Sequence, residues 1–322
     1  MRSVMFNLQF MNPGLSSALM LSTDDLKFIA AVTQAPSLAA AARSLNVTPP
    51  AVSQRLRALE TRLGVSLLDR SAGRITLTDE GELLTEWSAR ILAEIEEVSE
   101  RLCERKGVVA GHLRIAGPTG FGRRYIAPAV MDFSRRHPDV RIDLELSDNP
   151  IRLKPSAWDI VIHIGELHSQ PFQKLTLAPN DRLLCASPDY LARRGTPHAP
   201  ADLIRHSCLT LRENDEDVTL WRFSGPDGSH ETVRIDEGVS CNDGDVVRDW
   251  ALAGFGIVLR SEWDMADDLR AGRLVRLLPQ WRAPDAPVVA LLGPRHMRAA
   301  RTRRFLELLR QSLTPPPWRG QG

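Results

Sequence analysis

Residues 37–63 of this chain read SLAAAARSLNVTPPAVSQRLRALETRL, and this stretch decides how the N-terminal part folds. Apolar residues recur every three or four positions, both before Asn46 and after Pro50. This spacing predicts two short helices, each with one apolar stripe. Ser37 and Thr48 stand where the first turn of each helix needs a cap, and Asn46 tolerates the left-handed conformation that ends the first helix.

The second predicted helix has a polar outer face. Pro49 and Pro50 suit its first turn, because proline has no N–H group to leave unpaired there. Its apolar stripe comprises Val52, Leu56, Leu59 and Leu63, and its opposite face comprises Pro50, Gln54, Arg57 and Thr61, with Ser53 on the flank. An amide, a guanidinium and a hydroxyl near a helix start suit base edges and phosphates, which predicts a helix-turn-helix that enters the major groove of DNA. An ordinary helical hairpin with a solvated face is the alternative.

A small hairpin is predicted directly after this block. Residues 67–70 and 74–77 have the pattern of two short strands around a turn at 71–73, which would form a wing. Arg70 and Arg74 flank its tip, where they are placed to contact phosphates, although a plain surface hairpin fits the same pattern. The predicted DNA-binding residues are therefore Ser37, Thr48, Pro49, Pro50, Ser53, Gln54, Arg57, Arg70 and Arg74.

The charge distribution agrees with a DNA-binding region. Residues 37–78 hold six arginines against two acids, a net charge of +4, whereas the whole chain has a net charge of only +1. Positive charge is thus concentrated where the phosphate backbone would lie.

Length and composition limit the remaining choices. A chain of 322 residues with 43% hydrophobic and 25% charged residues is typical of a globular protein with two or three cores. The four cysteines are widely spaced and form no C-x-x-C pair, which favours a reducing cytoplasm over a disulfide framework or a zinc site. No apolar run is long enough for a membrane span. Residues 1–20 have no clear cleavage site and are predicted to be a disordered or misassigned extension.

A long helix is predicted over residues 79–106. Thr78 caps it, and acidic residues in its first turn favour the positive end of the helix. Apolar residues recur at intervals of three or four from Leu84 to Leu102, while nine acids against four bases give residues 79–106 a net charge of −5. A narrow apolar seam on a charged helix predicts a coiled-coil dimer, and packing within the same chain is the alternative.

Residues 107–310 alternate between predicted strands and helices. Strands are expected near 113–116, 140–146, 158–164, 183–187, 207–211, 233–239, 256–259 and 288–292, and helices near 126–133, 246–253 and 297–313. This alternation predicts a parallel sheet. The pattern recurs after about residue 183, and the proline-rich tail at 311–322 is predicted to be flexible.

Short motifs along residues 22–310 point to one family. In the N-terminal part they are residues 40–45 (AAARSL), 50–53 (PAVS), 59–64 (LETRLG), 67–70 (LLDR) and 77–81 (LTDEG). In the C-terminal part they are Pro138, residues 159–162 (DIVI), Trp221, Asn242-Asp243, residues 253–257 (AGFGI) and residues 272–274 (GRL). Together they strongly resemble the motifs of LysR-type transcriptional regulators, most specifically in the first 60 residues of the match.

The resemblance implies an α/β architecture in three parts. It implies a winged helix-turn-helix at 21–78, a dimerising linker helix at 79–106 and a two-lobed effector domain like a periplasmic binding protein at 107–310. Lobe I would take about 107–182 and 288–310, and lobe II about 183–287. The expected partners are promoter DNA, a small-molecule effector, further copies of the chain and RNA polymerase, with no cofactor. Position 49 departs from the family's usual glutamine, so more of the base reading falls to Ser53, Gln54 and Arg57.

The effector site is expected at the turn 118–122, between a strand and a helix. Parallel sheets place ligands there, and free N–H groups at a helix start favour a carboxylate or a similar anion. A tight turn without a ligand is the alternative from the residues alone, whereas the resemblance favours the site. His163 either faces the cleft or is a buried histidine with satisfied hydrogen bonds. The predicted effector-binding residues are Pro118, Thr119, Gly120, Phe121, His163, Thr210, Asn242 and Asp243.

Three classes of function remain in competition at this point. A regulator needs both the DNA-binding block and a ligand cleft. An enzyme with an attached DNA-binding module would need a catalytic constellation, and the sequence shows none at recognisable spacing. An architectural DNA-coating protein would not need a two-lobed domain. Cys208 lies in a context reminiscent of peroxide-sensing regulators, but a small buried residue is the simpler interpretation.

Overall fold

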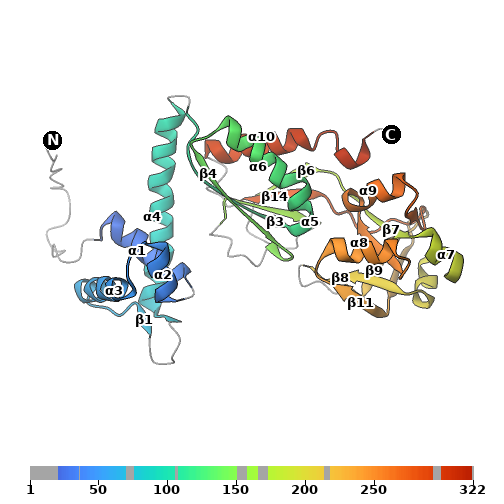
Figure 1. Ribbon diagram of the computed structural model, residues 1–322, viewed down its shortest axis with the longest axis horizontal. Helices are drawn as coiled ribbons and strands as arrows, with labels where there is room; N and C mark the ends of the chain where they lie inside the picture. The colour runs from blue at the N-terminus through green and yellow to red at the C-terminus, as the bar shows by residue number, and fades with distance from the viewer. Residues whose placement is uncertain are drawn as a thin grey trace. The chain divides into compact units, whose positions relative to one another are not determined.

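The computed structural model describes residues 21–35, 37–69, 76–105, 108–150, 158–165, 173–213, 218–292 and 299–320. The chain forms two compact units, Met1–Ser99 and Glu100–Gly322, which are described separately (Figure 1). The extension predicted for residues 1–20 lies outside the described residues.

The described part of the first unit begins with three short helices and a hairpin, and most of the long helix α4 follows them (Figure 1). The helices are α1 (Thr23–Gln34), α2 (Leu38–Ser44) and α3 (Pro49–Leu63), and the hairpin pairs β1 (Leu68–Asp69) with β2 (Thr76–Leu77) in antiparallel fashion. Ile29 of α1 and Leu56 of α3 are fully buried in the shared core. Ala41 and Ala42 of α2 are also buried, and their small side chains let neighbouring helices approach closely. The predicted helix-turn-helix and its wing strands are confirmed.

The turn between α2 and α3 follows most of the sequence-based prediction. The Ser37 hydroxyl accepts a hydrogen bond from the Ala40 N–H group at 3.1 Å, and Asn46 adopts a φ of 53°. Thr48 precedes α3, but its side chain makes no capping hydrogen bond, so that part of the prediction is wrong. With Pro49 and Pro50 in the first turn, few free N–H groups remain there for a side-chain cap to satisfy.

Helix α4 (Asp79–Glu104) is the long helix predicted after the wing. The Thr78 hydroxyl accepts a hydrogen bond from the Gly81 N–H group at 3.0 Å, which confirms the cap. Most of the predicted apolar seam is exposed on the helix, at Trp87, Ile91, Ile95, Val98 and Leu102.

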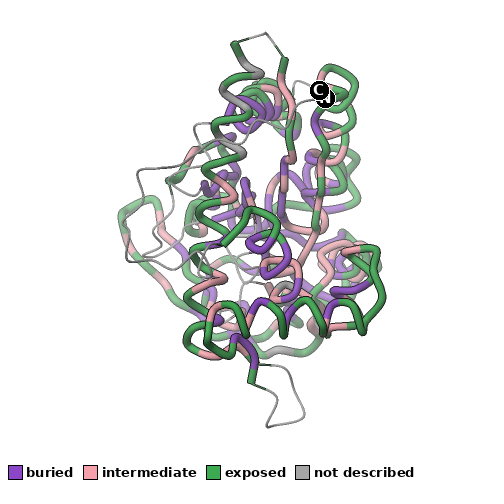
Figure 2. The backbone as a smooth tube through the Cα atoms, turned by 90° about the vertical axis from the view of Figure 1, so that its left-hand side faces the viewer, coloured by how far each residue is buried: buried purple, intermediate pink, exposed green. Residues whose placement is uncertain are grey.

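Lobe I of the second unit is built on a five-stranded sheet in the order β4-β3-β5-β14-β6. The strands are β3 (Gly111–Pro118), β4 (Val140–Ser147), β5 (Ile160–Ile164), β6 (Gln173–Ala178) and β14 (Val288–Leu292). β3 runs parallel to β4 and β5, but β14 runs antiparallel to β5 and β6. The sheet is therefore mixed rather than parallel, because β14 enters it in the reverse direction. β5 and β14 are buried along their whole length. Figure 2 colours buried backbone purple.

One continuous helical segment covers a face of this sheet. α5 (Thr119–Phe121), a π-helical turn (Gly122–Ile126) and α6 (Ala127–Arg136) follow β3 without a break. The separate turn predicted at 118–122 is therefore wrong, since residues 119–122 already belong to the helix. α10 (Ala300–Ser312) packs beside α6, with the rings of Phe133 and Phe305 5.5 Å apart between centroids.

Lobe II has a second five-stranded sheet in the order β11-β8-β12-β7-β13. Its strands are β7 (Arg182–Ala186), β8 (Cys208–Leu211), β11 (Glu237–Cys241), β12 (Ile257–Ser261) and β13 (Val275–Arg276). Helices α7 (Pro188–Arg194), α8 (Gly244–Leu252) and α9 (Glu262–Arg270) accompany it, and β9 (Leu220–Ser224) with β10 (His230–Arg234) forms a separate hairpin. The single strand predicted at 233–239 is wrong: its alternating pattern runs across the end of β10 and the start of β11, which belong to different sheets.

The C-terminal tail is packed rather than flexible. Trp318 is 4% exposed and belongs to the core of lobe I, with its ring centroid 5.3 Å from that of Tyr125. Arg319 donates hydrogen bonds to the carboxylates of Glu262 and Asp181, at 2.7 and 2.9 Å. The flexible-tail prediction is wrong over residues 311–320, because one aromatic side chain anchors a segment that forms little regular structure of its own.

Helix α9 joins the two lobes. Its Trp263 and Ala266 belong to the core of lobe I, whereas its Met265 belongs to the core of lobe II. The predicted boundary gave all of 183–287 to lobe II, but Trp263 and Ala266 within that range pack in the core of lobe I.

Candidate functional site

The exposed face of α3 carries the side chains predicted to meet DNA. Gln54 and Arg57 are exposed, with Ser53 half-buried beside them, while Leu56 on the opposite side is fully buried. Within the described part of the chain, neither the Gln54 nor the Arg57 side chain makes a hydrogen bond or an ion pair. Their donors are therefore available to another molecule.

Two other arginines of α3 are used inside the unit. Arg55 donates a hydrogen bond to the carbonyl oxygen of Asp24 at 2.9 Å, and its guanidinium lies 4.6 Å from the ring centroid of Phe28. Arg62 donates to the carboxylate of Asp25 at 2.5 Å. Both contacts hold α3 against α1, so only part of the positive charge counted in the sequence is available to DNA.

The structure describes four of the six other residues that were predicted to contact DNA. Ser37 and Thr48 are exposed, and the Thr48 hydroxyl is not engaged in capping. Pro49 and Pro50 are exposed at the start of α3 and offer no N–H group. Arg70 and Arg74 lie outside the described residues.

In the second unit, a cavity of about 30 Å³ lies between the lobes at the carboxyl end of β3. Residues that line it include Pro118, Thr119, Gly120 and Phe121 of lobe I and Asn242 of lobe II. A Cβ atom on Gly120 would lie 3.1 Å from Cη2 of Trp263, so this glycine lets the helix start approach the indole closely. The structure thus brings five of the predicted effector residues together around a space for only one or two water molecules.

Direct contacts between the lobes keep this cavity small. The Asn242 amide donates to the Asp148 carboxylate at 2.9 Å. Asp243 does not line the cavity; its carboxylate caps α8 by accepting from the Asp245 N–H group at 2.8 Å. The structure therefore places Asn242 in the cleft and gives Asp243 a capping position beside it.

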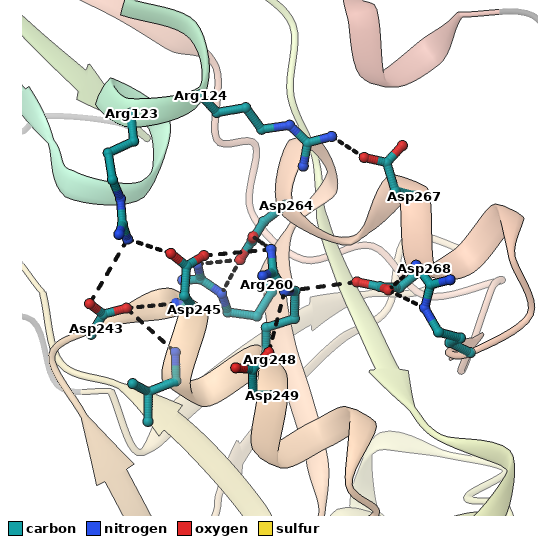
Figure 3. Close-up of polar contacts among 12 residues, drawn as sticks. Arg123, Arg124, Asp243, Asp245, Arg248, Asp249, Arg260, Asp264, Asp267 and Asp268 are labelled. Carbon is teal, nitrogen blue, oxygen red and sulfur yellow. Dashed lines mark hydrogen bonds and ion pairs between the residues drawn. The ribbon is translucent and has the colours of Figure 1, made fainter. Parts of the chain in front are cut away.

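Two arginines of the π-helical turn reach across to lobe II and α9 (Figure 3). Arg123 is hydrogen-bonded to Asp245 and lies 4.0 Å from Asp243, and Arg124 is hydrogen-bonded to Asp267. An effector larger than water therefore requires these pairs, or the lobes that carry them, to move.

A second, larger cavity of about 590 Å³ adjoins the first and shares Leu211, Glu213, Arg260 and Ser261 with it. Thr210, another predicted effector residue, lines this larger cavity together with Arg182 and Arg222. Its volume lies in the range of small-molecule sites.

His163 lines neither cavity. It is 1% exposed in the middle of β5, and neither ring nitrogen has a hydrogen-bond partner among the described residues. Burial, together with the positive charges of Arg182 and Lys174, lowers the pKa of His163 to about 4. It is therefore a neutral buried histidine, but not one with satisfied hydrogen bonds. Its Nε2 atom lies 3.9 Å from the position of a Cβ on Gly165, a residue that does line the larger cavity.

Cys185, Cys208 and Cys241, the cysteines whose side chains the structure describes, form no disulfide. Cys208 is buried in lobe II, and burial raises the pKa of its thiol to about 12. Cys241 pairs in register with Leu211 rather than with Cys208. In the described ranges no group of His, Cys, Asp or Glu is arranged to hold a metal ion, and no helix there is long and apolar enough to cross a membrane.

Both parts of the chain match known family profiles. Residues 23–82 match the bacterial regulatory helix-turn-helix protein, lysR family, and residues 106–314 match the LysR substrate binding domain. The chain belongs to the LysR family of transcriptional regulators. It is 35% identical to the HTH-type transcriptional regulator DmlR of Escherichia coli strain K12, over 89% of this chain and 93% of DmlR. It is 34% identical to the transcriptional activator TtdR of the same strain, over 88% of this chain and 91% of TtdR.

Solved structures of LysR-type regulators have the same fold. CrgA from Neisseria meningitidis is 28% identical, with a TM-score of 0.57 over 91% of this chain and 99% of CrgA. Full-length AphB from Vibrio cholerae is 23% identical, with a TM-score of 0.59 over 90% of this chain and 98% of AphB. The architecture predicted from sequence, a DNA-binding helix-turn-helix followed by a two-lobed effector-binding domain, is confirmed.

Sequence reasoning missed Arg182, Arg222 and Trp263, which the structure brings to the cleft. Arg182 begins a strand that was predicted, but its position gives no sign of a ligand. Arg222 lies on β9, which has no clear pattern in the sequence. Only the general rule that ligands lie at the carboxyl ends of parallel strands would have indicated this region.

Proposed function

We propose that this LysR-family regulator reads its promoter element with the exposed face of α3 and responds to a small anion in the cleft of its effector domain. The observation that carries the first half is the contrast within α3: Gln54 and Arg57 point outward without partners, whereas Arg55 and Arg62 are engaged with α1.

Each exposed group on α3 has a matching partner on DNA. A glutamine amide pairs with the N6 and N7 edge of adenine, and a guanidinium pairs with O6 and N7 of guanine in the major groove. Ser53 and Thr48 offer hydroxyls for phosphates or bases at the start of the helix. Arg70 and Arg74 of the wing remain predicted phosphate contacts.

Self-association through α4 is part of the proposal. The exposed seam from Trp87 to Leu102 is supported as a dimer contact by its apolar character and its helical spacing. A two-fold dimer would present two copies of α3 to successive major grooves, about 34 Å apart. Contact with RNA polymerase and a cytoplasmic location stay predictions.

The proposed effector site begins at Thr119. The helical segment that starts there follows the carboxyl end of β3, where the N-terminal end of a helix favours an anion. The cavity beside it lies between the lobes, so a ligand there would change how they close. A carboxylate is the proposed class of effector.

Quantitative footprinting on the DNA upstream of the neighbouring genes tests the DNA-binding half. We expect one pseudo-palindromic element, with an affinity that falls steeply as salt rises. Arg57→Ala should weaken binding to this element by about ten-fold more than binding to random duplex. Arg43→Ala, at an exposed arginine of α2, is the matched control and should weaken both equally. Equal losses with Arg57→Ala would assign Arg57 to the phosphates and remove it from base reading.

A further inference from the structure

Segments that join the two lobes meet at the buried Asn180. Residues 179–181 connect β6 of lobe I with β7 of lobe II, and residues 277–287 lead from β13 back to β14. The Asn180 side-chain amide donates to the carbonyl oxygen of Ala286 at 2.8 Å, and the Ala286 N–H group donates to the Asn180 carbonyl oxygen at 3.2 Å. The Trp263 N–H group, at the start of α9, donates to the Asn180 side chain at 3.3 Å. We name residues 180–181, 262–263 and 286 the hinge.

The C-terminal tail contacts this hinge through Arg319. Its guanidinium donates to both carboxylate oxygens of Glu262, at 2.7 and 2.9 Å, and to the Asp181 carboxylate at 2.9 Å. The Glu262 N–H group in turn donates to the Asp181 carbonyl oxygen at 2.7 Å. Paired bonds between a guanidinium and a carboxylate fix geometry as well as charge. One arginine side chain therefore ties the tail to two of the segments that form the hinge.

Trp318 holds the tail against two rings near the cleft. Its ring centroid lies 5.3 Å from that of Tyr125 and 6.2 Å from that of Phe121. Trp263 of α9 contacts the same two rings, at 6.1 and 5.4 Å. Such edge-to-face contacts stabilise beyond the burial of apolar area. Phe121 and Trp263 both line the small cavity at the carboxyl end of β3. The tail and α9 therefore share a pair of aromatic side chains, one of which forms part of the cavity wall.

The docking of the tail is weaker than the burial of Trp318 suggests. The indole N–H group of Trp318 is buried without a hydrogen-bond partner among the described residues, which costs free energy. The side chains of Arg319 and Asp181 are 36% and 58% exposed, so water screens their ion pair. A segment held in this way can detach while the sheets of both lobes stay folded.

We propose that residues 315–320 form a strap that fastens the hinge from outside the cleft, and that release of the strap frees the hinge. Arg319 holds the hinge and Trp318 holds the aromatic pair at the cavity, so both loosen when the strap detaches. The match to the LysR substrate binding domain ends at residue 314, so that match does not account for these contacts. An effect of the strap on promoter binding rests on the proposed function, but the mechanical link does not.

Hydrogen exchange at increasing urea, followed by mass spectrometry on the full chain, tests the strap. In the parent protein, the hinge amides should exchange through an opening that depends little on urea, because strap release exposes little surface. β5 and β14 should show the steep urea dependence of global unfolding. The measurement needs neither DNA nor an effector, so its outcome is independent of the function proposed above.

Arg319→Gln isolates the ionic part of the strap. The variant removes the ion pairs with Glu262 and Asp181 and leaves Trp318 in place. The urea-independent exchange of the hinge amides should therefore rise by about five-fold. Arg310→Gln, at an exposed arginine of α10, is the matched control and should leave this exchange unchanged.

Two substitutions of Trp318 test the aromatic part. Trp318→Ala should raise the exchange of the hinge amides at least ten-fold, because the ring that anchors the strap is lost. Trp318→Phe keeps an aromatic ring against Phe121 and Tyr125, so the exchange should stay within about three-fold of that of the parent.

Two results would overturn the strap. In the first, the hinge amides of the parent exchange with the same urea dependence as β5 and β14, which would make the tail part of one cooperative core. In the second, Arg319→Gln leaves the exchange of the hinge at the parent rate. Raised hinge exchange with an unchanged affinity for promoter DNA would keep the strap and remove only its role in regulation.

Discussion

The face of α3 and the cleft of the effector domain use the same residue type in different ways. On α3, a single helix presents Gln54 and Arg57 outward, and the pattern of its own fifteen residues decides which side chains are exposed. In the larger cavity of the effector domain, Arg182 of β7 and Arg222 of β9 come from separate sheets and line one space only after lobe II has folded. The difference teaches that a site on one helix is fixed by local spacing, whereas a site lined by strands of different sheets depends on topology.

The largest effect should come from the core beneath α3. Leu56 is fully buried, and Leu56→Ala should destabilise the first unit by about 3 kcal/mol, through lost burial and the cavity left behind. Hydrogen exchange followed by mass spectrometry should show lost protection in α1–α3 and unchanged protection in the effector domain. Val47→Ala, at an exposed site, is the control. An equal loss of protection in both units would contradict the view that the first unit and the effector domain fold independently.

His163 should make the effector domain sensitive to acid. Folding holds the pKa of His163 at about 4, while the unfolded chain has the ordinary value of 6.5, so the unfolded state binds more protons between these values. Stability is therefore lost as the pH falls from 6.5 towards 4, by about 2 kcal/mol at pH 5.

The variant His163→Leu isolates this effect. It removes the titrating group and two unpartnered nitrogens, so its stability should fall by about 2 kcal/mol less than that of the parent between pH 8 and pH 5. Urea unfolding at the two pH values measures the difference. Parallel losses in both proteins would show that His163 is not held neutral.

Arg62 tests whether the arginines of α3 that contact α1 are distinct from those that face outward. Burial raises the pKa of Asp25, but hydrogen bonds from Ser22 and the nearby charge of Arg62 outweigh it, so the pKa lies below its usual value. Arg62→Ala should cost the first unit about 1 kcal/mol, because the pair is partly exposed. Thermal unfolding measures this loss, and the ratio of specific to random DNA affinity should stay constant. A changed ratio would mean that Arg62 also contacts DNA.

The contacts between the lobes should give the smallest effect. Arg123 and Asp245 are both exposed enough that their ion pair contributes less than about 1 kcal/mol. Arg123→Gln should raise hydrogen exchange at residues 118–122 by up to about five-fold. Arg136→Gln breaks an ion pair to Asp132 within α6 and is the matched control. No change with Arg123→Gln would show that this pair does not hold the lobes together.

The helix-turn-helix could be predicted almost residue by residue, because its signals are local. Ser37, Asn46 and the stripe from Val52 to Leu59 act within one or two turns of helix. The missed features all depend on distant partners. Trp318 packs because Phe121 and Tyr125 receive it, and the lobe I sheet is mixed because β14 returns from lobe II. Nothing near His163 in the sequence shows that Gly165 separates it from a cavity.

The central claim is that Gln54 and Arg57 read bases in the major groove. The most direct test replaces each purine of the footprinted element in turn by its 7-deaza analogue, which removes only the N7 acceptor. Binding is then measured for the parent protein, Gln54→Ala and Arg57→Ala. The account predicts positions where the analogue weakens the parent by about ten-fold and leaves one of the variants unaffected. Analogue effects of equal size in all three proteins, or none at any position, would contradict it.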